Sequence, residues 1–195
     1  NPESLTMHWD GAGWAVVPNP GKSPLYAVKA IASNDVWAAG YETLLHWNGS
    51  NWSSVPFPQP NAEVFLRGLA ATSSSDVWAV GYQQWASGEG YLDAPISYHW
   101  NGTSWSLVPN AGTTYEYFFA VTAIAPNDVW AVGDNGQEQH WNGEAWSSAA
   151  APYPDLGGRF LGVAAAASNN VWAVGYYTQN ATYQHLTWID RYTVP

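Results

Sequence analysis

One short phrase occurs four times along the 195-residue chain: SNDVWAAG at 33–40, SSDVWAVG at 74–81, PNDVWAVG at 126–133 and SNNVWAVG at 168–175. The tryptophans that mark it are separated by 41, 52 and 42 residues, and they are Trp37, Trp78, Trp130 and Trp172. A period of about 40 to 50 residues is typical of β-propeller blades. The chain is therefore constrained to a repetitive architecture, and the phrase carries either chemistry or structure in every copy.

A second phrase lies between the copies of the first: HWDGAGWAVVP at 8–18, HWNGSNWSSVP at 46–56, HWNGTSWSLVP at 99–109 and HWNGEAWSSAA at 140–150. In each, an Asp-Gly or Asn-Gly pair separates two aromatic segments. Such a pair is a strong signal for a β-hairpin because both turn residues can adopt positive φ. We therefore expect each repeat to end in a hairpin with positive φ at both turn residues.

The first half of each repeat is also a pair of strands. An apolar run such as LYAVKAIA or FFAVTAIA leads into a turn of Ser, Asn and Asp residues, and DVWAVG then forms a second strand. Strands this apolar are expected to be buried on both faces. The unit has four strands, named a, b, c and d in chain order. The predicted fold is all-β, a β-propeller of four blades built from repeats of about 41–53 residues.

We divide the single domain, 1–195, into an N-terminal c–d hairpin at 1–18 and repeats at 19–56, 57–109, 110–150 and 151–195. The last repeat ends in TWIDRYTVP, with either Trp188 and Tyr192 in the two aromatic places or Arg191 and Tyr192 replacing His-Trp. If the N-terminal hairpin completes the last blade, a ring of four blades closes. If the last blade uses its own segment, the N-terminal hairpin is spare. A spare hairpin could begin a fifth blade, or it could pair with an open edge on a neighbouring subunit that completes the ring.

Charge and composition exclude several classes of partner. Five Lys and Arg stand against fifteen Asp and Glu, for a net charge of -10. We expect no nucleic-acid partner, because binding phosphates requires cationic side chains. The absence of Cys excludes disulfides and thiolate metal sites. No apolar run approaches the roughly 20 residues of a membrane span and no signal peptide precedes Asn1, so we expect a mature chain without membrane insertion.

The repeated polar residues indicate structure rather than catalysis. Asp35, Asp76 and Asp128 begin strand b, where a carboxylate can accept hydrogen bonds from backbone N–H groups of the a–b turn. The fourth copy has Asn170, which accepts a hydrogen bond but is neither an acid nor a base. Four histidines precede a tryptophan on strand c, and on separate blades they lie too far apart to share one zinc ion: His8, His46, His99 and His140. Since no catalytic motif occurs, we expect no enzyme activity, no catalytic residue, no metal site and no cofactor.

The connections between strands differ in how much their length varies. The c–d spacing between tryptophans is five residues in all four copies, whereas the b–c spacing from Gly to His is 6, 18 and 7 residues in successive repeats. Because strands alternate in direction, the b–c and d–a connections share one face, where binding residues are expected. The candidate ligand-binding residues lie there: Trp85, Tyr91, Asp93, Tyr115, Glu116, Tyr117, Tyr176 and Tyr177.

A strand b of DVWAVG, followed by a strand c and a Trp-bearing strand d, resembles the tectonin-type repeat of lectin propellers. It is more loosely similar to Trp-rich repeats of bacterial surface proteins. The resemblance touches all four units and implies a propeller that binds glycans between or above its blades. The chain departs from that pattern in its His-Trp pair and its regular Asn-Gly turn, so no binding residue of the family is carried over.

We expect a non-catalytic, extracellular, lectin-like binding module whose partner is a glycan or another surface ligand. Exposed aromatic rings would stack on the sugar, and Asn, Gln and Asp would bond to its hydroxyls. The alternative is a structural cell-surface subunit that assembles with copies of itself into an oligomer or filament by strand exchange. Four Asn-x-Ser/Thr sequons are candidate glycosylation sites and fit a secreted or cell-surface protein: Asn48, Asn51, Asn101 and Asn180.

Overall fold

The computed structural model describes residues 4–88, 90–149, 156–178 and 184–192. These residues form seventeen β-strands and no helix. The described part of the chain therefore contains no helix that could span a membrane. A short antiparallel pair comes first, β1 (Met7–Trp9) and β2 (Trp14–Val16), which we call the N-terminal hairpin.

Four larger antiparallel sheets follow along the chain. Sheet 1 contains β3 (Leu25–Ala32), β4 (Asp35–Gly40), β5 (Thr43–Trp47) and β6 (Trp52–Ser54). Sheet 2 contains β7 (Glu63–Ser73), β8 (Asp76–Ser87), β9 (Gly90–Trp100) and β10 (Trp105–Leu107). Sheet 3 contains β11 (Phe118–Ala125), β12 (Asp128–Gly133), β13 (Glu138–Trp141) and β14 (Trp146–Ser148). Sheet 4 contains β15 (Leu156–Ala167), β16 (Asn170–Thr178) and β17 (His185–Tyr192). Sheets 1 to 3 thus have the predicted order a, b, c, d, and sheet 4 has strands a, b and c.

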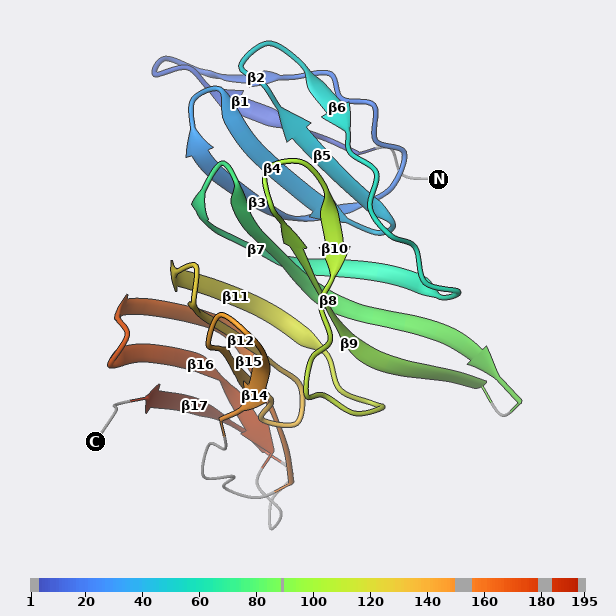
Figure 1. The fold of residues 1–195 in the computed structure, drawn as a ribbon, viewed down its shortest axis with the longest axis vertical. Coiled ribbons are helices and arrows are strands. Elements are labelled where there is room, and N and C mark those ends of the chain that lie inside the picture. Colours follow the sequence, from blue (N-terminus) through green and yellow to red (C-terminus); the bar gives the residue numbers. More distant parts are fainter. Residues whose placement is uncertain (1–3, 89, 150–155, 179–183, 193–195) are drawn as a thin grey trace.

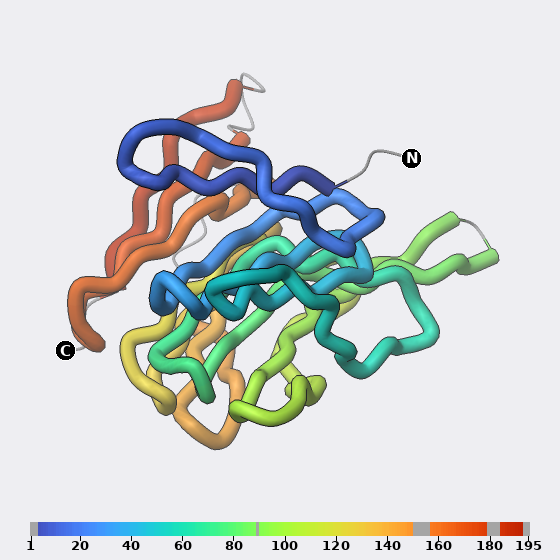
Figure 2. The backbone as a smooth tube through the Cα atoms, turned by 90° about the horizontal axis from the view of Figure 1, so that it is seen from above, coloured from blue at the N-terminus to red at the C-terminus, as the bar shows by residue number. Residues whose placement is uncertain are grey.

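The sheets pack face to face in series. Their first strands lie side by side in the order β3, β7, β11 and β15, and a backbone bridge between Asp134 and Arg159 links sheets 3 and 4. Figure 1 shows the N-terminal hairpin and sheet 4 at opposite ends of the longest axis. Figure 2, seen from above, shows the hairpin of β8 and β9 extending away from the rest of the molecule. The described residues form an open series of sheets.

The N-terminal hairpin does not complete sheet 4. The alternative in which this hairpin completes the last blade and closes a ring of four blades is therefore wrong. β1 pairs with β2 in a sheet of its own, and β17 supplies strand c of sheet 4. Trp172 lies opposite Arg191 in the same register in which Trp37 lies opposite His46. The interpretation in which Arg191 and Tyr192 replace His-Trp is therefore confirmed, and the N-terminal hairpin is spare.

A tryptophan on strand b fills each junction between sheets. Trp37 is buried, and the centroid of its ring lies 5.1 Å from that of Trp100 and 5.2 Å from that of Trp105, both in sheet 2. The same contact recurs at the next two junctions, at 5.0 and 5.3 Å from Trp78 to Trp141 and Trp146, and at 4.3 Å from Trp130 to Tyr192. Aromatic side chains therefore occupy the space between sheets.

The glycine that ends the first phrase is required by a close approach of two strands. A Cβ on Gly40 would lie 1.9 Å from the carbonyl oxygen of Pro24. At the other three copies the corresponding distances are 1.8 Å for Gly81, 1.6 Å for Gly133 and 1.8 Å for Gly175. Because any side chain here would collide with backbone, this glycine is architectural.

The c–d turns differ from the prediction. Trp47 pairs with Trp52, so the loop holds four residues, 48–51. Gly49 has a φ of 94°, whereas the φ of Asn48 is negative. The Oδ1 atom of Asn48 accepts hydrogen bonds of 2.9 Å from the N–H groups of Ser50 and Asn51. Positive φ at both turn residues was a wrong prediction, because the asparagine side chain closes the turn in place of a left-handed backbone.

The buried position of Trp130 gives a test of the junctions. Trp130→Ala should lower the free energy of unfolding by about 3–5 kcal/mol, because it leaves a cavity between sheets 3 and 4. The control is Leu107→Ala on the exposed part of β10, which should change it by less than about 0.5 kcal/mol. Urea unfolding followed by circular dichroism measures both, and equal effects would contradict the role of Trp130.

Candidate functional site

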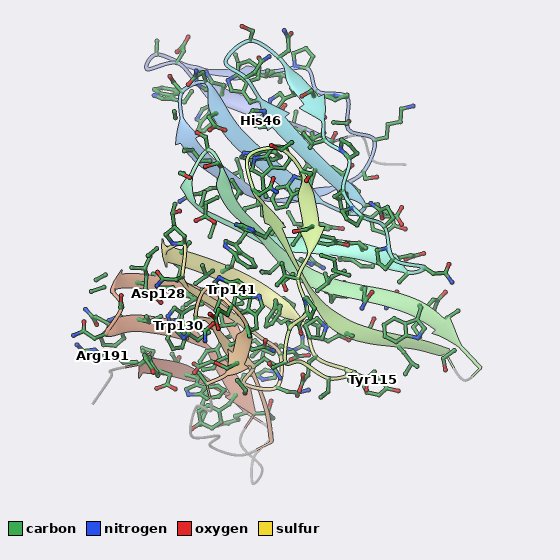
Figure 3. The ribbon with its side chains drawn as sticks, viewed as in Figure 1. His46, Tyr115, Asp128, Trp130, Trp141 and Arg191 are labelled. Atoms are coloured by element: carbon green, nitrogen blue, oxygen red, sulfur yellow. The ribbon has the colours of Figure 1, made fainter. Side chains whose placement is uncertain are left out.

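The two faces of the molecule carry different parts of each repeat. The a–b and c–d turns lie together, since a Cβ on Gly49 would come within 2.7 Å of Cβ of Asn34. We call this side the turn face, and the side with the b–c and d–a connections the connection face. Figure 3 shows Asp128 on the side of the turn face and Tyr115 on the side of the connection face.

Near the turn face of sheets 1 to 3, a histidine of strand c contacts the aspartate that begins strand b. The distance from Nε2 to Oδ1 is 2.8 Å for His46 and Asp35, 2.6 Å for His99 and Asp76, and 2.9 Å for His140 and Asp128. An ionised carboxylate only accepts hydrogen bonds, so Nε2 donates in each pair. Each imidazole also lies on the tryptophan of strand b, with ring centroids 4.5, 4.6 and 4.5 Å apart. Asp, His and Trp thus form one unit, the Asp–His–Trp unit, in each of the three sheets.

This unit corrects the role predicted for the aspartates, which was to accept backbone N–H groups of the a–b turn. Asp35 and Trp37 are two residues apart on one strand and share a face of the sheet, and His46 lies opposite Trp37 on the next strand. The carboxylate therefore points across the sheet to the imidazole. The turn is held instead by the tryptophan after the histidine, whose indole N–H donates to a turn carbonyl: Trp47 to Ser33 at 3.2 Å, Trp100 to Ser74 at 3.2 Å and Trp141 to Pro126 at 3.1 Å.

Sheet 4 keeps the unit with both polar members changed. Oδ1 of Asn170 accepts hydrogen bonds from Nε1 of Trp172 at 2.9 Å and from Nε of Arg191 at 3.0 Å. The guanidinium of Arg191 lies 5.2 Å from the centroid of the Trp172 ring. Arg191 therefore replaces histidine in both contacts, one a hydrogen bond and the other a cation–π contact.

The polar groups of different units stay apart. In the described part of the chain, no three His, Asp or Glu side chains come together in an arrangement that could hold a metal ion. His8 lies on β1 opposite Ala15, away from the other histidines in sequence and in sheet. Within each unit a charged carboxylate and a ring N–H make a charge-assisted hydrogen bond, which stabilises the sheet.

A buried acidic residue that no pattern in the sequence points to lies between sheets 3 and 4. Glu138 is 8% exposed and lines a cavity of about 10 Å³ together with Asp190. Burial, and then the negative charge of Asp190, raise the pKa of Glu138 to about 7. A perturbed pKa can mark a catalytic group. A cavity of this size holds no more than about one water molecule, so Glu138 is not open to a substrate.

The connection face carries an open depression with the character of a binding surface. β8 and β9 extend past the ends of β7 and β10 as a long hairpin, visible in Figure 1, and a depression of about 530 Å³ lies beside it. Its lining combines two aromatic side chains with three polar ones: Trp85, Tyr91, Asn61, Glu63 and Gln84. Tyr91 is 64% exposed and Trp85 is half-buried. Two of the predicted ligand-binding residues are thus brought together with polar groups that the sequence did not point to.

Asp93 and Tyr117 connect the base of this hairpin to the segment before sheet 3. Asp93 is buried, and its Oδ1 accepts a hydrogen bond from Nε2 of Gln84 at 2.7 Å. Its Oδ2 accepts one from the hydroxyl of Tyr117 at 2.8 Å. Burial, and next this hydrogen bond, raise the pKa of Tyr117 to about 12. Both oxygens of Asp93 are therefore engaged within the protein.

The other four predicted candidates do not line the depression. Tyr115 is exposed with a φ of 68°, and Oε2 of Glu116 accepts a hydrogen bond of 2.5 Å from the N–H group of Thr113. The ring of Tyr176 lies 4.9 Å from that of His185, and Tyr177 packs against the hydrophobic core of sheet 4. Tyr115 and Glu116 thus lie in the connection before β11, whereas Tyr176 and Tyr177 lie in strand β16.

A row of half-buried rings on the connection face was missed from the sequence. The ring centroid of Tyr41 lies 4.9 Å from that of Phe65, Phe65 lies 4.7 Å from Tyr82, and Tyr82 lies 4.7 Å from Tyr117. The signal that could have found it is the tyrosine directly after the glycine of strand b, at 41, 82 and 176. The row packs successive sheets together along this face.

Three of the four sequons lie on the turn face. Asn48, Asn51 and Asn101 are exposed in c–d turns. The side-chain oxygens of Asn48 and Asn101 close those turns by accepting backbone N–H groups. Asn180 lies outside the described residues.

The sequence matches no protein-family model, and no curated protein matches it. Solved structures do match. The chain is similar to YCF48 from Cyanidioschyzon merolae, with a TM-score of 0.57 and 14% identity, over 92% of this chain. The fold is that of a β-propeller. The chain spans 59% of the length of that structure, and at this identity the likeness shows the fold alone.

A second solved structure, described as YCF48 bound to D1 peptide, matches with a TM-score of 0.42 and 15% identity, covering 98% of this chain and 72% of that one. This weaker match adds nothing to the assignment of the fold. The predicted all-β propeller is confirmed, whereas the tectonin-type resemblance stays a prediction.

The Asp–His–Trp unit gives a test with a natural control. Asp128→Ala should lower the free energy of unfolding by about 1–3 kcal/mol, because it leaves the donors of His140 and Trp130 unpaired. Asp128→Asn keeps the acceptor, as Asn170 does in sheet 4, and should cost less than about 1 kcal/mol. Chemical unfolding of the two variants checks this, and equal losses would show that charge rather than the acceptor matters.

The raised pKa of Glu138 predicts a dependence of stability on pH. Because the pKa of about 7 in the folded state lies above the ordinary glutamate pKa of 4.5, the stability that this group contributes is complete below the unfolded pKa and is lost as pH rises through the folded pKa. Glu138→Gln should therefore raise the free energy of unfolding at pH 8, on the order of 1–2 kcal/mol after allowance for solvent screening. At pH 4 the variant and the parent should be equally stable. Urea unfolding at both pH values measures the difference between variant and parent. An equal gain in the free energy of unfolding at pH 4 and pH 8 would rule out titration of Glu138 as the cause.

Proposed function

We propose that the protein is a non-catalytic binding module that binds carbohydrate in the depression whose lining includes Trp85 and Tyr91. The observation that carries the proposal is the composition of that depression, whose lining combines two aromatic residues with residues that bear amide and carboxylate groups, in an open site of about 530 Å³. Ring faces provide apolar contact for the C–H groups of a sugar, and amides and carboxylates pair with its hydroxyls.

The charge of the site favours a neutral sugar. None of the residues that line the depression is Lys or Arg, and Glu63 adds a carboxylate. The whole chain has a net charge of -10. An anionic glycan would meet repulsion here without a cation to pair with it. The proposed ligand class is therefore an uncharged oligosaccharide.

The anchoring of the hairpin supports the proposal. The hydrogen bonds of Asp93 to Gln84 and Tyr117 join β8, β9 and the segment before β11. An anchored base reduces the conformational entropy that the site loses on binding. Asp93 and Tyr117 would thus act as positioning residues, and Trp85 and Tyr91 as contact residues.

The finer features expected from the sequence belong to this proposal. A secreted or cell-surface location fits a glycan-binding protein with exposed sequons at Asn48, Asn51 and Asn101. A lectin function would also agree with the tectonin-type resemblance. We count four blades, sheets 1 to 4, and take the N-terminal hairpin as the outer half of a further blade.

The test is binding to an array of immobilised oligosaccharides, followed by titration of the best neutral hit. Trp85→Ala and Tyr91→Ala should each weaken binding about tenfold, because each removes a stacking surface. Trp14→Ala removes an exposed tryptophan on the N-terminal hairpin and should bind as the parent does.

Unchanged affinity in both depression variants would remove this site. Binding to no neutral glycan would remove the proposed function. Unfolding temperatures of the three variants should stay close to that of the parent, which separates a contact role from a packing role.

A further inference from the structure

The outer face of sheet 4 is uncovered at positions that are buried in every other sheet. Trp172 is 42% exposed, whereas its counterparts are nearly inaccessible: Trp37 at 1%, Trp78 at 0% and Trp130 at 2%. In those three sheets the next sheet along the chain covers the ring. Among the described residues, sheet 4 therefore presents a junction tryptophan that no ring of a following sheet covers.

Two neighbours of Trp172 are also exposed, whereas the residues in the same places of other sheets are buried. Val174 is 46% exposed, and the residue two positions after the junction tryptophan is at most 1% exposed in the other sheets: Ala39, Val80 and Val132. Ile189, opposite Val174, is 59% exposed, whereas Leu44 in the same place of sheet 1 is 1% exposed. The exposed side chains form one apolar surface, the C-terminal face: Trp172, Val174 and Ile189.

The opposite end of the molecule presents the other half of a junction. Trp9 and Trp14 on the N-terminal hairpin have ring centroids 6.0 Å apart at 54°. The pairs that receive a junction tryptophan inside the molecule have the same geometry, at 5.8 Å and 47° for Trp100 and Trp105, and at 6.0 Å and 51° for Trp141 and Trp146. Trp14 is 66% exposed, whereas Trp105 and Trp146 are buried. Trp9 and Trp14 therefore already have the geometry of a pair that receives a junction tryptophan, although Trp14 is exposed.

A groove lies between the N-terminal hairpin and sheet 1. It has a volume of about 260 Å³ and a mainly apolar lining that includes Met7, Val28, Val36 and Trp52. Val28 is 70% exposed, whereas Val121 in the same place of sheet 3 is 9% exposed. We call the ring pair and this groove together the N-terminal face.

We propose that the C-terminal face of one copy of this chain packs against the N-terminal face of a second copy, with Trp172 meeting the pair of Trp9 and Trp14. The occupant is a second copy because the two faces are the two halves of a junction that the chain already forms three times. The contact is head to tail, so it propagates into a closed ring or an extending row of copies. It goes beyond the proposed carbohydrate site, which lies on the connection face and is made by sheet 2 and the connection that precedes it.

The experiment is sedimentation velocity with light scattering over a range of protein concentrations. The parent should exceed the mass of one chain, 21.2 kDa, and its mass should rise with concentration. Ile189→Asp on the C-terminal face and Trp14→Asp on the N-terminal face should each reduce it to a single chain. Leu107→Asp places the same charge on an exposed apolar residue of β10 and should leave association unchanged.

A mixture of the two interface variants gives the sharper result. Each variant keeps one intact face, so the mixture should form a complex of two chains and nothing larger. Circular dichroism shows whether each variant is folded, and because the two changes lie at opposite ends, one folded variant suffices for the single-variant test. A parent of one-chain mass at every concentration up to about 200 μM, a range that spans ordinary weak dissociation constants, would overturn the proposal. Association that survives both Asp variants, or that Leu107→Asp also abolishes, would overturn it as well.

Discussion

The insertion of one tryptophan from each sheet into the next is the contact on which the rest of the structure depends. In sheet 2 the ring of Trp78 lies on His99 of its own sheet and against Trp141 and Trp146 of sheet 3. A buried aromatic ring of this kind contributes a large apolar area together with a specific geometry. The sheets are short on their own, so their stability comes from this packing between neighbours, as in other repeat proteins.

The other repeated residues of the two phrases hold that tryptophan ring in position. The aspartate holds the histidine, the histidine lies on the ring, and the glycine lets strand a approach the end of strand b. Sheet 4 shows that the parts change together, since Asn170 and Arg191 replace Asp and His and still form a bonded group around Trp172. The repeated phrase is therefore architecture.

The sequence predicted most of this architecture because repetition is visible without coordinates. The four-strand unit and the two faces followed from spacing, whereas spacing left two alternatives open for the spare hairpin and for the residues that replace His-Trp in the last repeat. Roles that depend on where a side chain points did not follow. The carboxylate of Asp35 reaches across the sheet to His46, and the side chain of Asn48 closes its own turn. Glu138 was missed because its burial and its proximity to Asp190 arise only when sheets 3 and 4 pack.

The candidate site was predicted in part for the same reason. The length of the b–c insertion located Trp85 and Tyr91, but Asn61 in the connection before β7 and Glu63 at the start of β7 join them only in the folded protein. Asp93 was expected to face a ligand, and its two oxygens instead bond to Gln84 and Tyr117. The spacing of the repeats thus locates the variable surface. Only the folded structure shows which of its side chains bond within the protein and which are exposed.

The most direct test of the junction is a double-mutant cycle between Trp78 and Trp146, which belong to different sheets and touch only through their rings. The indole N–H groups of both have no hydrogen-bond partner among the described residues, so replacement by leucine removes ring packing and no hydrogen bond. The account predicts that the losses in free energy of unfolding are not additive, with a coupling of about 0.5–1.5 kcal/mol. Losses that add to within about 0.3 kcal/mol would contradict the claim that this contact joins the sheets.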